Sequence, residues 1–501
     1  MTPPCVWIWA LPVGFVVPAA TAAASIPGPA EQDPGIQSLK RVLLLEPDFG
    51  NGTLSGSSVL TISNASQEPI TRVPLIMYHM LHVTSARTSD GRTLEFTEHV
   101  VPMKGHERML VNSADIALNR PMPPGGTLTL RTQYAGTLGG YEEAGHSYLK
   151  DHVNGDFTII RSDCLAYPIV CRPTMDDYLK SIYHDLKHGW DYYLEVTVPA
   201  DLVVANGGRS LENVSQNGMV TYRYESIKPA WRIDICIGRY RALRGEDSSL
   251  TVFSLPDSEE QAGAVLSALS GAMHFLSECF GPAPEFEAFA VIEVPDGYGS
   301  QADRTCILQE ADAFRGNLHR IYHEVSHLWN PPAVDEHPSR FESEGLATFL
   351  EYWLQERLDG RTGQLEEGLE LCRQRFCEQC RRDPRYRDTP IADYGTQDLT
   401  DASYTKGMIA FWILYRLVGE QAFLETYRTF CLEYRQNGAT LEDFIRIAKK
   451  GSERDLEKFL DEWIYGAKSS GYLLDGIPFE QILRLYEVEQ GASGDPDKPR
   501  R

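Results

Sequence analysis

Two histidines and a glutamate in the stretch IYHEVSHLWN, residues 321–330, have the spacing of a metal site. His323 and His327 are four positions apart, and Glu324 directly follows the first histidine. On an α-helix, residues four positions apart lie about 40° apart around the axis, so both imidazoles can bind one ion. Glu324 would lie about 100° from His323, close to a metal-bound water without binding the metal itself. The pattern predicts a zinc site that makes hydroxide available at neutral pH.

A catalytic zinc site takes three protein ligands and keeps one position for water, so a third ligand is needed. The prolines of NPPAV, residues 330–334, must end the first helix, and a second helix is expected within residues 337–353. Glu344 lies on the first turns of that second helix, seventeen residues after His327. The second helix can fold back and aim this carboxylate at the same ion. The sequence therefore predicts one zinc ion bound by His323, His327 and Glu344.

Other polar residues of these two segments have structural interpretations. Ser339 is the expected N-cap of the second helix, with Glu342 three residues further on in a capping-box pattern. His319 and His337 lie close to the motif in the sequence. We interpret both as exposed surface histidines and not as further metal ligands.

The composition is that of a soluble globular protein with two or three domains: 501 residues, 42% hydrophobic and 23% charged. A formal net charge of −23 opposes binding to polyanions, so nucleic acid is not expected as a partner. The ten cysteines form no repeated CxxC pair of the kind that a zinc ribbon needs. Cys164 and Cys171 could bridge a loop, whereas Cys372, Cys377 and Cys380 are interpreted as free thiols.

The amino terminus carries an apolar run. Residues 5–24, CVWIWALPVGFVVPAATAAA, contain no charged side chain. Such a run is typical of a secretory signal or a short membrane anchor, with a disordered apolar leader as the alternative. We therefore expect an apolar leader over residues 1–30, through which the protein is exported or associated with a membrane. A cytoplasmic location is the alternative.

The chain changes character near residue 245. Before this point, short runs rich in β-branched and aromatic residues are bounded by turn residues, which predicts an all-β, sandwich-type domain over residues 31–245. After it, apolar residues recur at three- and four-residue spacing, which predicts a mostly helical domain over residues 246–485. A solvated tail is expected over residues 486–501. Helices are expected at residues 258–280, 315–329, 340–358, 363–382, 403–418, 420–435 and 454–465, and a strand at 285–295.

Three motifs, in order along the chain, resemble those of a known family. HEVSHLW at residues 323–329 resembles the zinc helix of the gluzincin metallopeptidases of the membrane alanyl aminopeptidase family, which includes leukotriene hydrolase. ESEGLATFLEY at residues 342–352 resembles the family's NEGFA segment, with Glu344 in the place of the zinc ligand. SYTKG at residues 403–407 resembles its tyrosine motif. The resemblance gives Tyr404 the role of the phenol that hydrogen-bonds the developing oxyanion.

The resemblance also implies a fold of the α+β class. Residues 228–243, KPAWRIDICIGRYRAL, look like strands of the family's amino-terminal, saddle-shaped β-domain. Residues 456–466, LEKFLDEWIYG, look like the end of its catalytic domain. The implied architecture is an N-terminal all-β saddle or sandwich domain followed by a mostly helical, thermolysin-like zinc peptidase domain. This would be a compact two-domain form, without the large helical carboxy-terminal domain of full-length members.

Two features depart from the family pattern. The interval between His327 and Glu344 is two residues shorter than usual, which a connecting loop can absorb. The family's GAMEN segment, whose glutamate grips the free amino group of the substrate, should fall near residues 294–310, and no such motif is there. Gln301 and Asp303 are the candidate substrate-binding residues in its place.

Together these residues predict zinc-dependent hydrolysis of peptide bonds, of an aminopeptidase-like kind. Glu324 would take the proton of the metal-bound water and pass it to the leaving amine, while Tyr404 would stabilise the oxyanion. Residues 304–309 would form the edge strand along which an extended peptide substrate lies, with a core-filling strand as the alternative.

Two alternatives use the same residues. One is hydrolysis of a non-peptide substrate such as an epoxide, which the leukotriene hydrolase branch of the family implies. The other is a catalytically silent scaffold, in which the β-domain binds a partner and zinc stabilises the fold. The intact Glu324 and Tyr404 argue against the scaffold, because a structural zinc needs neither a base nor an oxyanion donor. The sequence leaves open the residue preference at the cleavage point, the need for a free amino terminus and the oligomeric state.

Overall fold

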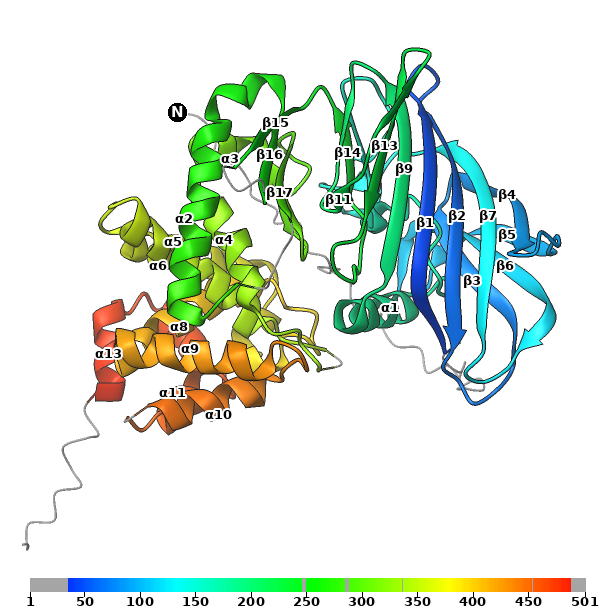
Figure 1. Cartoon of the computed structure of the whole chain (residues 1–501). Helices are drawn as coiled ribbons and strands as arrows, with labels where there is room; N and C mark the ends of the chain where they lie inside the picture. The colour runs from blue at the N-terminus through cyan, green and yellow to red at the C-terminus, as the bar shows by residue number, and fades with distance from the viewer. Residues whose placement is uncertain (1–34, 246–248, 284–287, 336, 453, 488–501) are drawn as a thin grey trace, which may run out of the picture. The chain divides into compact units, whose positions relative to one another are not determined.

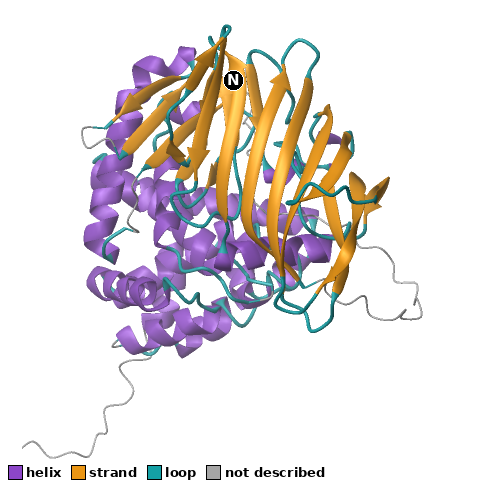
Figure 2. Ribbon diagram, turned by 45° about the vertical axis from the view of Figure 1, so that its right-hand side comes forward, coloured by secondary structure: helices purple, strands orange, loops and turns teal. Residues whose placement is uncertain are grey.

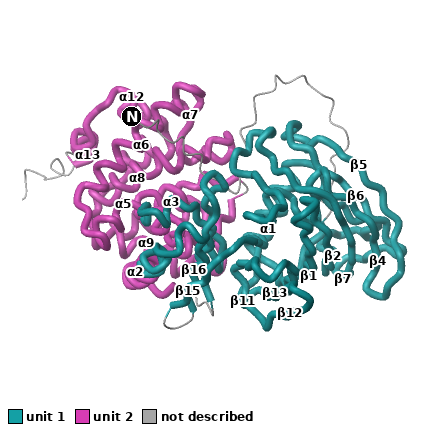
Figure 3. The backbone as a smooth tube through the Cα atoms, turned by 90° about the horizontal axis from the view of Figure 1, so that it is seen from above, with its two compact units in different colours: residues 1–267, 286–318 teal, residues 268–285, 319–501 magenta. Residues whose placement is uncertain are grey.

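The computed structural model describes residues 35–245, 249–283, 288–335, 337–452 and 454–487. The chain divides into two compact units, residues 1–267 with 286–318 and residues 268–285 with 319–501 (Figure 3). The expected leader over residues 1–30 lies outside the described residues, as do residues 488–501 of the expected tail. Within the described ranges, no helix is both long and apolar enough to cross a membrane.

The largest sheet of the first unit contains long strands whose buried and exposed residues alternate. β1 (Ile36–Asp48) pairs antiparallel with β2 (Thr53–Asn64) and parallel with β9 (Asp191–Pro199). β9 buries every second residue, from Tyr192 to Val198, as the period of two in its sequence requires. The other strands are β4 (Leu81–Thr88), β7 (Thr127–Thr137), β11 (Arg209–Ser210), β12 (Val214–Gln216) and β13 (Met219–Glu225). The strand order is β11-β13-β9-β1-β2-β7-β4, with β12 on β13. Figure 1 labels the strands from β11 to β4, and Figure 2 shows all strands in orange.

A second sheet, of three strands, packs its buried side chains into the same core. Its strands, in spatial order, are β3 (Ile70–Tyr78), β6 (His106–Met122) and β5 (Phe96–Met103). Leu43 and Leu60 of the first sheet and Val73 and Val111 of the second belong to one buried cluster. The prediction of an N-terminal β-domain of sandwich type is confirmed.

One helix interrupts this β-rich region. α1 (Met175–His188) begins after Thr174, whose hydroxyl accepts a hydrogen bond of 3.1 Å from the backbone N–H of Asp177. The sequence pattern does not predict this helix, because most of its residues are polar and only Met175 and Tyr178 are buried. The N-cap residue, Thr174, is the sequence feature from which this helix could have been predicted.

Two smaller sheets complete the first unit. One has the order β10 (Val203–Ala205), β14 (Ile235–Gly238) and β8 (Phe157–Ile160). The other has the order β15 (Arg241–Arg244), β16 (Leu250–Ser254), β17 (Phe289–Val294), β19 (Cys306–Glu310) and β18 (Gln301–Ala302). The short helices of this unit are η1 (Glu142–Ala144), η2 (Ser162–Cys164), η3 (Pro256–Gln261) and α3 (Ala311–Phe314).

The five-stranded sheet confirms one strand prediction and corrects another. β17 lies within the expected strand at residues 285–295, and all six of its residues are buried between two parallel neighbours. The expectation that residues 304–309 form an edge strand is wrong. β19 lies between β17 and β18, because Gln301 and Ala302 pair antiparallel with Leu308 and Ile307 on its outer side.

The second unit is helical. Helix α2 (Ala262–Phe280) crosses the division between the two units. The remaining helical segments are α4 (His319–Ser326), η4 (His327–Trp329), η5 (Phe341–Gly345), α5 (Leu346–Leu358), α6 (Gln364–Arg382), α7 (Arg385–Asp388), η6 (Ile391–Asp393), α8 (Ala402–Val418), α9 (Glu420–Tyr434), α10 (Leu441–Gly451), α11 (Glu457–Trp463), α12 (Lys468–Leu474) and α13 (Phe479–Glu487).

Most of these helices follow the sequence prediction. The expected segments at residues 340–358, 363–382, 403–418 and 420–435 agree with the structure to within one or two residues. The predicted helix at residues 315–329 begins later, at His319, because the chain turns at Gly316 with a φ of 123°. Helices α10, α12 and α13 were not predicted, although α10 begins with a capping box between Thr440 and Asp443.

No disulfide forms between cysteines of the described ranges. All nine cysteines within the described ranges are free thiols. The suggested bridge between Cys164 and Cys171 is therefore wrong, whereas the interpretation of Cys372, Cys377 and Cys380 as free thiols is confirmed.

Candidate metal centre and active site

Helix α4 and the 3-10 turn η4 carry the two histidines. Ile321 and Val325 are fully buried and fix one side of α4 in the core, while His323 lies on a neighbouring, equally buried part of the helix. Trp329 ends the 3-10 turn, and its indole N–H donates a hydrogen bond of 2.9 Å to the carbonyl of Gly281. Asn330 then leaves the helix with an extended backbone. The prediction that the helix ends before the prolines is confirmed.

The second segment begins differently from the prediction. Ser339 does not form a capping box, because its hydroxyl accepts from the N–H of Phe341, two residues on, at 3.2 Å. Arg340 takes the cap position with a φ of 65° and makes no side-chain cap bond. Phe341 then stacks on Phe411 of α8, with ring centroids 4.5 Å apart, and the chain makes a π-helical turn, η5, before α5. Single π-turns of this kind are frequent at functional sites.

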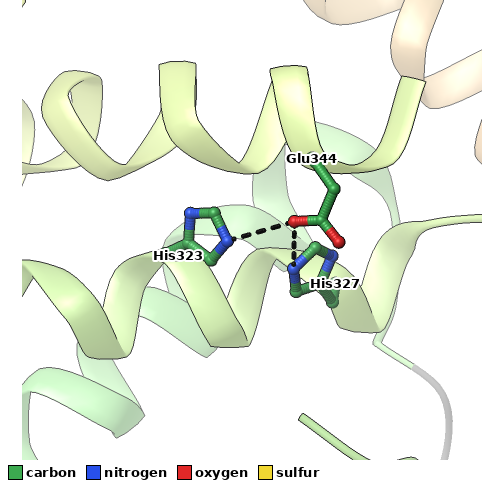
Figure 4. A group of neighbouring side chains, drawn as sticks. All are labelled: His323, His327 and Glu344. Carbon is green, nitrogen blue, oxygen red and sulfur yellow. Dashed lines mark ion pairs between the residues drawn. The ribbon is translucent and has the colours of Figure 1, made fainter. Parts of the chain in front are cut away.

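The π-turn brings Glu344 to the two histidines. One carboxylate oxygen, Oε2, lies 3.4 Å from Nε2 of His323 and 3.4 Å from Nε2 of His327 (Figure 4). Oε2 is buried and has no hydrogen-bond partner among the described residues. The donor atoms of these three residues all lie within 4.8 Å of one another. The structure therefore assembles the three residues that the sequence predicted as metal ligands.

This spacing fits a zinc ion. Zinc bonds of about 2.0–2.1 Å in a tetrahedron place neighbouring donor atoms roughly 3.3–3.4 Å apart. Burial, followed by the charge of His323, lowers the pKa of His327 to about 3, although 20% of its side-chain surface is exposed. The imidazole of His327 is therefore neutral and has a lone pair for a metal. The buried Oε2 of Glu344, which has no hydrogen-bond partner among the described residues, is positioned to be the third donor.

Each histidine has a polar residue at its other ring nitrogen. Oε2 of Glu351 lies 3.3 Å from Nδ1 of His323, and the side-chain amide of Asn330 lies 2.9 Å from Nδ1 of His327. Such contacts fix the ring orientation and the tautomer of metal-binding histidines. Sequence reasoning missed Glu351. The available signal was its position seven residues after Glu344, which is about two helical turns.

Glu351 also contacts a histidine that was interpreted as a surface residue. Nε2 of His319 lies 3.4 Å from Oε1 of Glu351, and the His319 side chain is only one-quarter exposed. The interpretation of His319 as an exposed surface histidine is therefore wrong. His337 is exposed, as expected. Although burial acts to raise the pKa of Glu351, the opposing interactions with His323 and His319 leave it lowered.

Tyr404 and Glu324 lie at the same centre. The Tyr404 ring, on α8, stacks almost parallel to the His323 ring, at 10° and with centroids 5.9 Å apart. Burial raises the pKa of Tyr404, and the nearby Arg340 acts in the opposite direction, so the phenol keeps its proton at neutral pH. Glu324 is buried on α4, and its charge acts on both Tyr404 and His327.

Gln301 and Asp303 belong to the first unit and lie in a buried polar network there. The amide nitrogen of Gln301 donates to Asp163 at 2.8 Å, and its carbonyl oxygen accepts from Arg232 at 2.6 Å. Asp303 has a buried oxygen, Oδ1, without a hydrogen-bond partner among the described residues. Burial, followed by the charge of Asp234, raises the pKa of Asp303 to about 6.

Comparisons with known proteins agree with this site. Residues 303–463 match the model of the peptidase family M1 domain. The search of curated proteins found no match. Among solved structures, the M1 zinc metallopeptidase from Deinococcus radiodurans is similar at 18% identity with a TM-score of 0.58, over 90% of this chain and 94% of that one. A mutant of it bound to a Tyr-Ser-Ala substrate is similar at 19% identity with a TM-score of 0.60, over 86% and 94% of the two chains.

A third solved structure, a two-domain M1 zinc metallopeptidase mutant bound to L-tryptophan, is similar at 18% identity with a TM-score of 0.56, over 88% of this chain and 94% of that one. These likenesses show the fold and confirm the expected α+β architecture, with a β-rich N-terminal part and a helical part after it. The matched region contains the two histidines of the HExxH motif, the glutamate after it and the tyrosine motif. Residues 303–463 therefore form a peptidase family M1 domain, and the chain is an enzyme.

Proposed function

We propose that this chain hydrolyses peptide bonds with one zinc ion bound by His323, His327 and Glu344. The observation that carries the proposal is the position of the Glu344 carboxylate, 3.4 Å from a ring nitrogen of each histidine. Zinc bound there supplies a water of lowered pKa and polarises the scissile carbonyl. The protein residues around it have the remaining roles.

Glu324 is the proposed general base. Its carboxylate is buried on α4, in the residue next to His323. Its charge acts to raise the pKa of both His327 and Tyr404. A carboxylate in such a partly desolvated site can take a proton from water and then deliver it to the leaving amine. The same residue thus serves the attack and the collapse of the tetrahedral intermediate.

Tyr404 is the proposed donor to the oxyanion. Its phenol keeps its proton at neutral pH, because burial raises its pKa, and its ring lies against the ring of His323. A hydrogen-bond donor that is already positioned where negative charge develops raises the rate by a factor of about 10²–10³. The phenol costs little reorganisation, because helix α8 holds it in place.

A free amino group at the start of the substrate is the proposed recognition element, with Gln301 and Asp303 as candidate anchors. A related enzyme of this fold binds a Tyr-Ser-Ala substrate. Asp303 is the better supported of the two, because its Oδ1 has no hydrogen-bond partner in the described part of the chain, whereas Asp163 and Arg232 bind both ends of the Gln301 amide. Above about pH 6, Asp303 is ionised and can bind an ammonium group.

The test compares one short peptide in two forms, with a free and with an acetylated amino terminus. Zinc-loaded protein is used, with Glu324→Gln as the blank. Cleavage of the free form alone supports an aminopeptidase, and Asp303→Asn should then raise KM. Cleavage of both forms contradicts the need for an amino-group anchor. If the parent protein cleaves neither form, the proposal of peptide hydrolysis fails.

A further inference from the structure

Arg340 has a backbone conformation that directs its side chain to the metal-ligand group. Its φ of 65° and ψ of 13° lie in the left-handed region, which is strained for a non-glycine residue. Its side chain is only 16% exposed, and Nη2 donates to Oε1 of Glu344. One oxygen of the Glu344 carboxylate thus accepts a hydrogen bond from Arg340, and the other faces the two histidines.

The same guanidinium lies over the proposed oxyanion donor. Its central carbon is 5.9 Å from the centroid of the Tyr404 ring. The two groups also interact electrostatically, since Arg340 favours the ionised form of the Tyr404 phenol against the effect of burial. Arg340 therefore links a metal ligand on the π-turn to the phenol on helix α8.

A second nitrogen of this guanidinium, Nη1, is not used by Glu344. The nitrogen Nη1 of Arg340 is buried and has no hydrogen-bond partner among the described residues. Burying a donor without a partner costs the free energy of its lost hydration, which a bound acceptor recovers. Guanidinium groups prefer anionic oxygens, with which they form short, charge-assisted hydrogen bonds. The same guanidinium contacts the predicted metal ligand Glu344 and lies over the ring of Tyr404.

We propose that Arg340 binds an anionic oxygen of the substrate next to Tyr404, an inference that rests on the proposed peptidase function. The oxygen has two sources with the same chemistry. It is either the oxyanion of the tetrahedral intermediate, formed as water adds to the scissile carbonyl, or the free carboxylate of a short peptide. Nη1 donates to this oxygen while Nη2 stays on Glu344. Arg340 is thus a second donor at the centre, beside the phenol.

The experiment uses the full-length, zinc-loaded protein and its Arg340→Gln and Arg340→Lys variants. Two peptides are compared that differ only at the carboxy terminus, one a free acid and the other an amide. Zinc content, kcat and KM are measured for each, and rates are expressed per bound zinc. Calorimetry gives the Kd of a phosphinic peptide, which carries a tetrahedral anion. Arg357→Gln is the control, because Arg357 pairs with Glu420 on the surface of the same unit.

If the oxyanion is the ligand, Arg340→Gln lowers kcat about 10²-fold on both peptides and weakens phosphinic peptide binding by a similar factor. If a substrate carboxylate is the ligand, KM for the free acid rises about 10-fold or more while the amide is unaffected. Arg340→Lys should retain part of either effect, because it keeps the charge but loses the fork of donors. Arg357→Gln should match the parent protein.

A loss of zinc with unchanged kinetic constants per zinc and unchanged phosphinic peptide binding would overturn the proposal, and Arg340 would only position Glu344. Unchanged values of kcat, KM and Kd in both Arg340 variants would also overturn the proposal. Failure of the peptidase function is distinguishable, because the parent protein would then cleave neither peptide. Phosphinic peptide binding to the parent and to Arg340→Gln would still decide whether Arg340 binds an anion.

Discussion

Glu351 and His323 are joined by a contact of 3.3 Å between a carboxylate oxygen and Nδ1, the ring nitrogen that faces away from Glu344. Glu344 and Glu351 are seven residues apart on one continuous helical segment, so two helical turns present both carboxylates to the same imidazole. The Glu351 carboxylate orients the His323 ring, and the Glu344 carboxylate lies at the ring nitrogen that is predicted to bind the metal. A single helical segment therefore places one carboxylate at each ring nitrogen of His323.

This relationship predicts that Glu351→Gln weakens zinc binding. The amide keeps the shape of the side chain but removes the charge that holds His323, so we expect zinc affinity to fall about 10–100-fold. Competition with a chelator of known affinity measures the change. Glu366→Gln, at an exposed position on α6, is the matched control. Equal zinc affinity in Glu351→Gln and the parent protein would show that the contact has no role at the metal.

Glu324→Gln should separate metal binding from catalysis. The amide cannot take a proton from water, so kcat should fall about 10²–10⁴-fold, while zinc content stays at the parent level. Peptide hydrolysis and metal analysis on the same protein sample test both parts. Full activity in this variant would remove Glu324 from the role of base.

Tyr404→Phe should lower turnover without releasing zinc. The ring that stacks on His323 is kept and only the donor is lost, so kcat should fall about 10²–10³-fold with little change in KM. Steady-state kinetics with zinc analysis provides the measurement. An unchanged kcat would mean that the phenol does not contact the oxyanion.

A buried lysine two residues from Tyr404 predicts a pH dependence of stability. Burial lowers the pKa of Lys406 to about 7, and its amine donates to Ser470 at 3.1 Å. An unfolded lysine titrates near 10.4, so between about pH 7 and pH 10 only the unfolded chain holds this proton, and stability rises with pH. Below pH 7 both states are protonated, and the cost of the buried charge is present in full.

We therefore expect Lys406→Met to be more stable than the parent protein at pH 7, by about 1–3 kcal/mol. The difference should shrink as the pH approaches 10. Urea unfolding at both pH values measures it, with Lys450→Met, at an exposed position on α10, as the control. A less stable Lys406→Met at pH 7, or a difference independent of pH, would contradict the assignment.

The sequence predicted the three ligand residues because their signals are local. His323 and His327 follow from helical spacing, and Glu344 follows from a helix that restarts after prolines. The β-rich and helical halves follow from hydrophobic periods of two and of three to four. Each of these features depends on neighbouring residues, so one sequence is sufficient to read it.

The features that the sequence did not reveal depend on tertiary contacts. Glu351 carries no motif, and its role follows only once α5 packs against α4. The left-handed Arg340 and the π-turn replace the expected capping box, because Phe341 must reach Phe411 in the core. The extra outer strand β18 is two residues long, too short to show a period.

Zinc stoichiometry and peptide hydrolysis, measured together on the parent protein, Glu324→Gln and His327→Ala, test the central claim most directly. The account predicts one zinc ion per chain in the first two proteins and a loss of zinc from His327→Ala, with hydrolysis in the parent protein alone. Hydrolysis by a zinc-free parent protein would contradict it. So would a His327→Ala variant that keeps both its zinc and its activity.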